Sequence, residues 1–150
     1  MTGTAHFLCG VIVAVGLAAA TAALAHQGVK NPAVMQRMDA MRIIADNTKA
    51  LGAMAKGERA FEAAVARQAA AAIASGADRM PALFRAPEDD PKSEARPAIW
   101  QQFDDFTDRA QQLSIAADRA ARGIASPADL GPALVAIGGA CKSCHTVYRE

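Results

Sequence analysis

The chain has 150 residues and a mass of 15.5 kDa, which is enough for one domain and leaves no room for a second core. Its 16 basic and 15 acidic residues give a formal net charge of +1, so it lacks the basic field that nucleic-acid binding requires, and no nucleic-acid partner is expected. Aromatic residues make up only 5% while alanine is abundant, which argues against an all-β fold and predicts a helical domain.

The first 25 residues contain no lysine, arginine, aspartate or glutamate. An apolar run over residues 7–17 passes into alanine and threonine and ends in Ala23-Leu24-Ala25, a pattern typical of signal-peptide cleavage sites. We therefore predict that residues 1–25 are a signal peptide, and that the mature domain, 26–150, is exported to the periplasm with no stable membrane insertion after processing. An uncleaved membrane anchor stays open as the alternative, because the apolar stretch through Ala25 is 19 residues long and residues 1–6 lack the usual lysine or arginine.

The first expected helix has signals at both ends. Asn31 before Pro32 is typical of a helix N-cap followed by proline at the first helical position, and Gly57 is expected to end the helix. Between them, apolar residues recur at alternating steps of four and three, which predicts one continuous apolar seam. The seam consists of Val34, Met38, Met41, Ala45, Thr48, Gly52 and Ala55, with Ile44 and Leu51 beside it.

A second helix is expected over residues 58–75, ending at Gly76, and its many alanines suit close contact with a neighbouring helix. Residues 76–97 form a long connection, because the four prolines in it prevent a continuous helix. Leu83 and Phe84 lie within this connection and are expected to anchor it to the core.

The last two helices have the most regular apolar pattern. The third is expected over about residues 97–122, before Gly123, and the fourth starts after Ser126, an N-cap with Asp129 as its capping-box partner. The seam of the third helix is Ile99, Phe103, Phe106, Ala110, Leu113, Ala117, Ala120 and Ile124. The seam of the fourth is Leu130, Leu134, Ile137, Cys141, Cys144 and Tyr148. Four amphipathic helices of this kind predict an all-α fold, an antiparallel four-helix bundle.

The most informative motif is Cys-x-x-Cys-His at residues 141–145, the attachment pattern of c-type haem. Two thiols three residues apart lie on one face of a helix, where they can add to the two vinyl groups of a porphyrin. His145 follows directly and can supply an axial nitrogen to the iron. The motif therefore predicts one covalently attached haem c, bound through Cys141, Cys144 and His145.

Three other uses of the two cysteines are weaker. A disulfide between Cys141 and Cys144 would be strained on a helix and would close almost no loop. A thioredoxin-like pair needs a βαβ context, which the pattern does not provide. A zinc site needs about four ligands, and the mature chain offers two cysteines and two histidines, His26 and His145.

The sixth iron ligand cannot be chosen from spacing. Methionine can bind haem iron, but it is also a common core filler. Arg37 lies one turn before Met41, so its forked donors could reach a haem propionate, with a solvated surface charge as the alternative. The candidate ligands on the first helix are Met35, Met38, Met41 and Met54.

With these motifs, the chain resembles the class II cytochromes c, the cytochrome c′ group, across essentially the whole mature length. The attachment motif behind three helices is typical of this family, because ordinary class I cytochromes c carry it near the N-terminus. The resemblance implies a left-twisted antiparallel four-helix bundle with haem in its core. The matching residues are Arg37-Met38-Asp39-Ala40-Met41, Ala55-Lys56-Gly57-Glu58, Leu83-Phe84, Ile99-Trp100, Phe103, Phe106 and the run from Cys141 to Arg149.

The same resemblance assigns a role to Met41. In this family the residue four positions after the first-helix arginine faces the distal side of the iron. It is commonly leucine in the high-spin cytochromes c′ and methionine in the low-spin branch. Met41 therefore implies the low-spin, Met-ligated branch, with His145 and Met41 as the iron ligands.

Two functions follow from the resemblance. A periplasmic single-haem electron carrier, not an enzyme, is expected to exchange electrons with redox partner proteins. The alternative is a five-coordinate, high-spin cytochrome c′ that binds NO or CO. A peroxidase-like enzyme is disfavoured, because the mature chain has no histidine beyond His26 and His145 to serve as a distal acid or base. Whether the protein is a monomer or a homodimer stays open.

Overall fold

Four long helices account for most of the residues that the computed structural model describes, which are 28–150. The expected signal peptide, its cleavage site and His26 lie outside these described residues. The long helices are α1 (Pro32–Ala55), α2 (Ala63–Asp78), α5 (Phe103–Gly123) and α6 (Leu130–Tyr148). The short elements are α3 (Met80–Leu83), α4 (Ala98–Gln101) and the 3₁₀ turn η1 (Pro127–Asp129).

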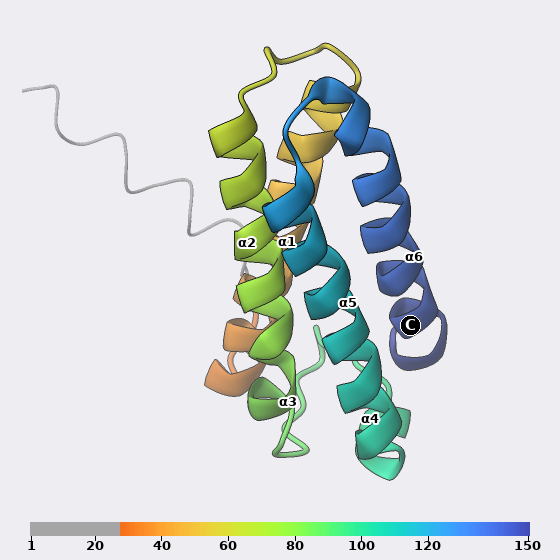
Figure 1. The fold of residues 1–150 in the computed structure, drawn as a ribbon. Helices are drawn as coiled ribbons and strands as arrows, with labels where there is room; N and C mark the ends of the chain where they lie inside the picture. Colours follow the sequence, from red (N-terminus) through yellow and green to blue (C-terminus); the bar gives the residue numbers. More distant parts are fainter. Residues whose placement is uncertain (1–27) are drawn as a thin grey trace, which may run out of the picture.

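The four long helices pack as an antiparallel bundle (Figure 1). A turn joins α1 to α2 at one end, and η1 joins α5 to α6 at that same end. The connection through α3 and α4 closes the opposite end. The predicted all-α four-helix bundle is confirmed, because all four long helices contribute buried apolar residues to one shared core.

The ends of α1 agree with the sequence signals. The side chain of Asn31 accepts hydrogen bonds from the backbone N–H groups of Ala33, at 2.8 Å, and Val34, at 3.3 Å. Pro32 occupies the first helical position, where its missing N–H costs nothing. At the other end Gly57 has φ +73°, a left-handed conformation that glycine adopts without strain.

The second helix differs from its expected limits at both ends. It starts at Ala63 because the backbone N–H groups of Glu58 and Arg59 both donate to Ala53 of α1, so that turn cannot begin a new helix. Gly76 was expected to end α2 but lies inside it. A Cβ at this position would come within 2.8 Å of Ile44 Cγ1. The glycine therefore permits close contact between α1 and α2 instead of ending the helix.

The third expected helix is interrupted. Gln102 has φ −131° and ψ 46°, outside the helical region, so the segment divides into α4 and α5. The connection before it contains the single turn α3, which the prolines had not suggested. Phe84 is 6% exposed and anchors this connection in the core as expected.

The capping box before the last helix forms as predicted. The carboxylate of Asp129 accepts the backbone N–H of Ser126 at 2.7 Å and of Ala125 at 3.0 Å. The hydroxyl of Ser126 donates to the same carboxylate at 2.9 Å. The first turn is the 3₁₀ segment η1, and the α-helix proper starts three residues later than the capping box indicated.

A buried aspartate fastens the long connection to the start of α1. Asp90 is 6% exposed, and its carboxylate accepts the backbone N–H groups of Lys30, at 2.8 Å, Asn31, at 3.0 Å, and Lys92, at 3.0 Å. These hydrogen bonds lower the pKa of Asp90 below its ordinary value, because they favour the ionised carboxylate. The connection is thereby held across the end of the bundle.

Candidate functional site

A cavity of about 770 Å³ lies between α1, α5 and α6. Its size is within the range of about 300–1,000 Å³ that is usual for cofactor sites. The connection contributes Phe84, Glu94 and Ala95, and α3 contributes Met80. From the long helices the lining includes Arg37, Met38, Met41, Ala45, Thr48 and Gly52 of α1, Phe106, Arg109, Ala110 and Leu113 of α5, and Leu134, Cys141, Cys144, His145 and Tyr148 of α6.

The apolar seam predicted for α1 faces this cavity. Met38, Met41 and Ala45 line it together with Ile44 from the neighbouring stripe, whereas Leu51 of that stripe is buried against the other helices. Helix α1 therefore carries two apolar faces. One packs against protein and the other borders a space of cofactor size.

The three residues of the attachment motif all line the cavity from α6. Cys141 and Cys144 are free thiols, half-buried, one turn apart on the same face. Burial raises the pKa of both thiols, and at Cys144 the positive charge of Arg109 opposes this shift. Burial, with the nearby charge of Arg149, lowers the pKa of His145. Its imidazole is therefore neutral at pH 7, and a nitrogen lone pair is available to a metal.

The structure can be compared with the three other roles considered for the two cysteines, a disulfide, a thioredoxin-like pair and a zinc site. The two thiols are not joined in a disulfide. Over residues 28–150 the helices leave no βαβ unit around the motif. Within that same range no three side chains among His, Cys, Asp and Glu gather as a metal-ion site. The two thiols, the neutral imidazole and the apolar cavity fit a covalently attached haem.

The structure reduces the number of methionines that could be the sixth iron ligand, and it adds one new candidate. Met38 and Met41 line the cavity, whereas Met35 and Met54 do not, and Met54 is buried in the core at 3% exposed. Met80, which was not among the candidates predicted from the sequence, also lines the cavity from α3 and is 2% exposed. Because Met80 sits in a proline-rich connection, no helical seam marked it.

Arg37 is not a surface charge, so that alternative was wrong. The side chain is 3% exposed, and its guanidinium donates to three backbone carbonyls. It also lies over the rings of Phe84, at 4.7 Å, and Trp100, at 5.5 Å. Arg37 therefore holds the connection against α1 while lining the cavity. The acceptors are Leu83 (3.0 Å from Nε), Glu88 (2.7 Å from Nη1) and Ala86 (2.6 Å from Nη2).

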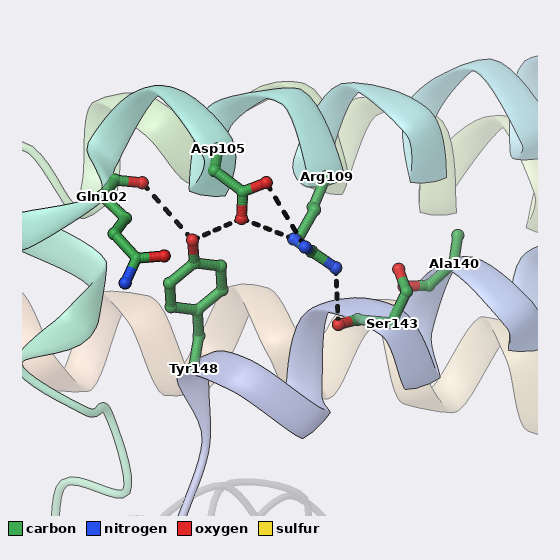
Figure 2. Close-up of polar contacts among 6 residues, drawn as sticks. All are labelled: Gln102, Asp105, Arg109, Ala140, Ser143 and Tyr148. Carbon is green, nitrogen blue, oxygen red and sulfur yellow. Dashed lines mark hydrogen bonds and ion pairs between the residues drawn. The ribbon is translucent and has the colours of Figure 1, made fainter.

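A polar network joins α5 to the attachment motif (Figure 2). Asp105 accepts from Arg109 Nε at 2.6 Å and Nη2 at 3.3 Å, and from the hydroxyl of Tyr148 at 2.5 Å. Nη1 of Arg109 donates to the carbonyl of Ser143 at 3.0 Å. Hydrogen bonds from Arg109 and Tyr148 lower the pKa of Asp105, while burial and Asp105 raise the pKa of Tyr148 to about 12.

Arg109 and Asp105 were not predicted from the sequence. Their separation by four residues on one helix was the only available signal, and many surface ion pairs have the same spacing. Nothing in the sequence indicated that Arg109 would reach across to α6.

A second contact lies at the cavity wall near His145. Arg149 pairs with Glu94, with 2.5 Å between Nε and Oε2, and an isolated β-bridge joins Ala95 to Arg149. The backbone N–H of Arg96 also donates to the carbonyl of Tyr148 at 3.0 Å. The end of α6 is thereby tied to the connection.

A helix that brings two free thiols and a neutral imidazole to an apolar cavity within a four-helix bundle defines a c-type cytochrome site. The chain belongs to the cytochrome c′ family, since the sequence model described as Cytochrome C′ matches residues 32–149. The family resemblance is confirmed. The cofactor is covalently attached haem c, as in other members of this family.

Proteins named cytochrome c-556 and proteins named cytochrome c′ are similar to this chain at nearly the same identity. Cytochrome c-556 of Agrobacterium tumefaciens (strain apple 185) is 38% identical over 114 residues, which cover 75% of this chain and 90% of the relative. Cytochrome c′ of Pararhodospirillum photometricum is 36% identical over 122 residues, covering 78% and 95%. The comparisons therefore assign the family and leave the branch open.

The fold agrees with a solved relative. The structure of cytochrome c′ from Rhodopseudomonas palustris aligns with a TM-score of 0.74 at 34% identity, covering 81% of this chain and 98% of that one. Within residues 28–150 no helix is both long enough and apolar enough to cross a membrane.

Proposed function

We propose that this chain is a periplasmic electron carrier whose single haem iron is bound by His145 and Met41. Cys141 and Cys144 would form the two thioether bonds. The observation that carries the proposal is that Met41 and His145 line the same cavity from two different helices, α1 and α6. The family relationship supports the attachment, and the c-556 relatives are compatible with methionine at this position.

The chain's own residues suit electron transfer. Bound haem would supply the one-electron couple between ferrous and ferric iron. The neutral imidazole of His145 and the thioether of Met41 would be held by two packed helices, so the ligand set would change little on reduction. Histidine and methionine together also raise the reduction potential relative to stronger donors. Apolar side chains such as Phe106 and Leu113 line the cavity and would shield a bound haem from water.

Arg37 would donate hydrogen bonds to a propionate at the edge of the bound haem. Three of the five N–H donors of its guanidinium are used by backbone carbonyls, so two are left for a propionate. Because Arg37 also holds the connection over the cavity, its contact with a propionate would link that segment to the cofactor.

The second candidate is a five-coordinate iron that binds NO or CO. The observation in its favour is the apolar lining contributed by α1 around Met38 and Ala45, which would accept a neutral diatomic ligand if Met41 did not bind the iron. Relatives named cytochrome c′ have nearly the same identity to this chain as those named c-556. Spin state separates the two functions.

The deciding experiment is an absorption spectrum of the haem-loaded protein. With Met41 bound, we expect a low-spin ferrous spectrum and a weak near-infrared charge-transfer band from methionine to ferric iron. Met41→Leu keeps volume and apolarity, so it is expected to cost less than about 1.5 kcal/mol of stability. The variant is nonetheless expected to become high-spin and to bind CO.

Met38→Leu and Met80→Leu are the matched controls, because both residues line the same cavity. Both are expected to leave the spectrum unchanged. A high-spin wild-type protein would favour the gas-binding function, and a spin change in Met38→Leu or Met80→Leu would move the ligand to that residue.

A further inference from the structure

We propose that Arg109, held in place by Asp105, is a positioning residue that raises the reduction potential of the iron from the side of the attachment motif. The inference rests on the proposed attachment of haem at Cys141 and Cys144, but not on Met41 as the sixth ligand.

The geometry starts at the middle of the attachment motif. Ser143 lies between the two cysteines, and its carbonyl accepts Nη1 of Arg109 at 3.0 Å (Figure 2). A helix carbonyl has two lone pairs and uses one within the helix, so the arginine takes the second. Cys144 and His145 follow Ser143 directly, and their backbone is therefore held against α5.

Arg109 is itself fixed from two directions. Asp105 holds the guanidinium through two nitrogens, at 2.6 and 3.3 Å, and the same carboxylate accepts the hydroxyl of Tyr148 at 2.5 Å. Tyr148 is 3% exposed and its ring packs edge-on against Phe106, with 5.5 Å between the centroids. Two residues of α5 and two of α6 thus form a closed brace across the helix pair.

The positive and the negative charge of the brace differ in their position relative to the cavity. Arg109 lines the cavity and Asp105 does not. The side chain of Arg109 is 27% exposed and that of Asp105 is 46% exposed, so water screens the negative charge more than the positive one. A positive charge on the cavity wall favours the ferrous iron, which carries one positive charge fewer than the ferric iron. Arg109 is therefore expected to raise the potential, with Asp105 setting its place and tempering its charge.

The other charged residues that line the cavity, which also include Arg42 and Lys49 of α1, differ from this pair. Arg149 is paired with Glu94, and both side chains are more than half exposed, at 53% and 58%. Arg37 lies on α1 and is occupied by carbonyls of the connection. Among the described cavity residues, Arg109 is the cation that is bound directly to the backbone of the attachment motif.

The test measures the midpoint potential of the haem-loaded variants by spectroelectrochemical titration, together with their melting temperatures. Arg109→Gln removes the positive charge and is expected to lower the equilibrium constant for reduction by about threefold to tenfold. A tenfold change corresponds to about 59 mV for one electron. Asp105→Asn leaves Arg109 without its counter-charge and is expected to raise the constant by about the same factor. Both variants lose hydrogen bonds, so both melting temperatures are expected to fall.

The opposite signs separate this role from a structural one, because loosening the brace alone would move both potentials in the same direction. Arg109→Lys keeps the charge and is expected to stay within about threefold of the wild-type constant. The matched control is Arg122→Gln, which removes an exposed arginine paired with Asp118 on the same helix and is expected to leave the potential unchanged.

The inference is overturned if Arg109→Gln and Asp105→Asn shift the potential in the same direction, if neither shifts it, or if Arg109→Lys behaves like Arg109→Gln. Intact mass is measured first on every protein. A wild-type protein without covalent haem would contradict the proposed function, whereas loaded variants with unmoved potentials contradict this inference alone.

Discussion

The two thiols at the cavity wall give the most direct prediction at the scale of single residues. Cys141 and Cys144 are free and face the same space as His145. We expect the mature protein to exceed the mass of its chain by one haem, and the haem to stay attached during acid–acetone extraction and denaturing electrophoresis. Cys144→Ala is expected to lose most of the loaded protein, because one of the two covalent links is then missing.

Ser143→Ala is the control for this change. It alters the same turn but keeps both thiols and the carbonyl that Arg109 binds, so loading is expected to persist. A wild-type mass equal to the bare chain would contradict the attachment.

Some residues of the site could be predicted from the sequence, and others could not. Cys141, Cys144 and His145 could be identified because their chemistry depends on spacing along one helix. Arg37 could not be placed from spacing, because its burial depends on carbonyls about 50 residues further along the chain. Arg109 was missed for the same reason, since its acceptor lies on another helix.

At the scale of helices, the close contact between α1 and α2 depends on Gly76. A Cβ at this position would lie 2.8 Å from Ile44 Cγ1 and 3.2 Å from Cδ1, so one helix or the isoleucine must shift. Gly76→Ala is therefore expected to destabilise the protein by about 1–3 kcal/mol, despite the better helix propensity of alanine. Thermal or denaturant unfolding measures the change.

Gly138→Ala is the matched control, because it lies in α6 with no atom within 4 Å of the added Cβ. It is expected to gain about 0.5–1 kcal/mol from helix propensity. Equal effects of the two substitutions would show that the α1–α2 contact does not limit stability.

The fastening of the connection predicts a dependence on acid. The folded pKa of Asp90 is lowered, so its stabilising contribution is fully present above the ordinary carboxyl pKa of about 4 and is lost as the pH falls through the folded value. Asp90→Asn is expected to lower the melting temperature at pH 7, and the difference from wild type is expected to shrink below about pH 4.

The control for the acid experiment is Asp108→Asn, an exposed position on α5. Its difference from wild type is expected to be small at both pH values. A constant deficit for Asp90→Asn across the whole range would mean that the ionised carboxylate is not what holds the connection.

Helix limits show what local patterns can and cannot predict. The N-cap at Asn31 and the capping box at Ser126 were predicted correctly, because their partners lie within a few residues. Gly76 was misjudged, because a glycine that ends a helix and one that admits a neighbour look alike in sequence. The break at Gln102 had no local signal, since neither glycine nor proline marks it.

At the scale of the whole molecule, a prediction concerns residues 1–25, which lie outside the residues that the structure describes. We propose that residues 1–25 direct export and are removed. Protein recovered from the periplasmic fraction is then expected to begin at His26 when its N-terminus is sequenced. Recovery in the membrane fraction alone, with Met1 still present, would mean that the segment is an anchor.

The two apolar faces of α1 have a consequence for the protein before it is loaded. One face packs against protein, and the other lines the cavity of about 770 Å³. Burying apolar surface stabilises a folded chain. Haem bound in the cavity would cover the second face of α1, so the loaded protein is expected to melt at a higher temperature than the chain without haem when both are followed by calorimetry. The cofactor would thus complete the hydrophobic interior of the protein after the chain has been made.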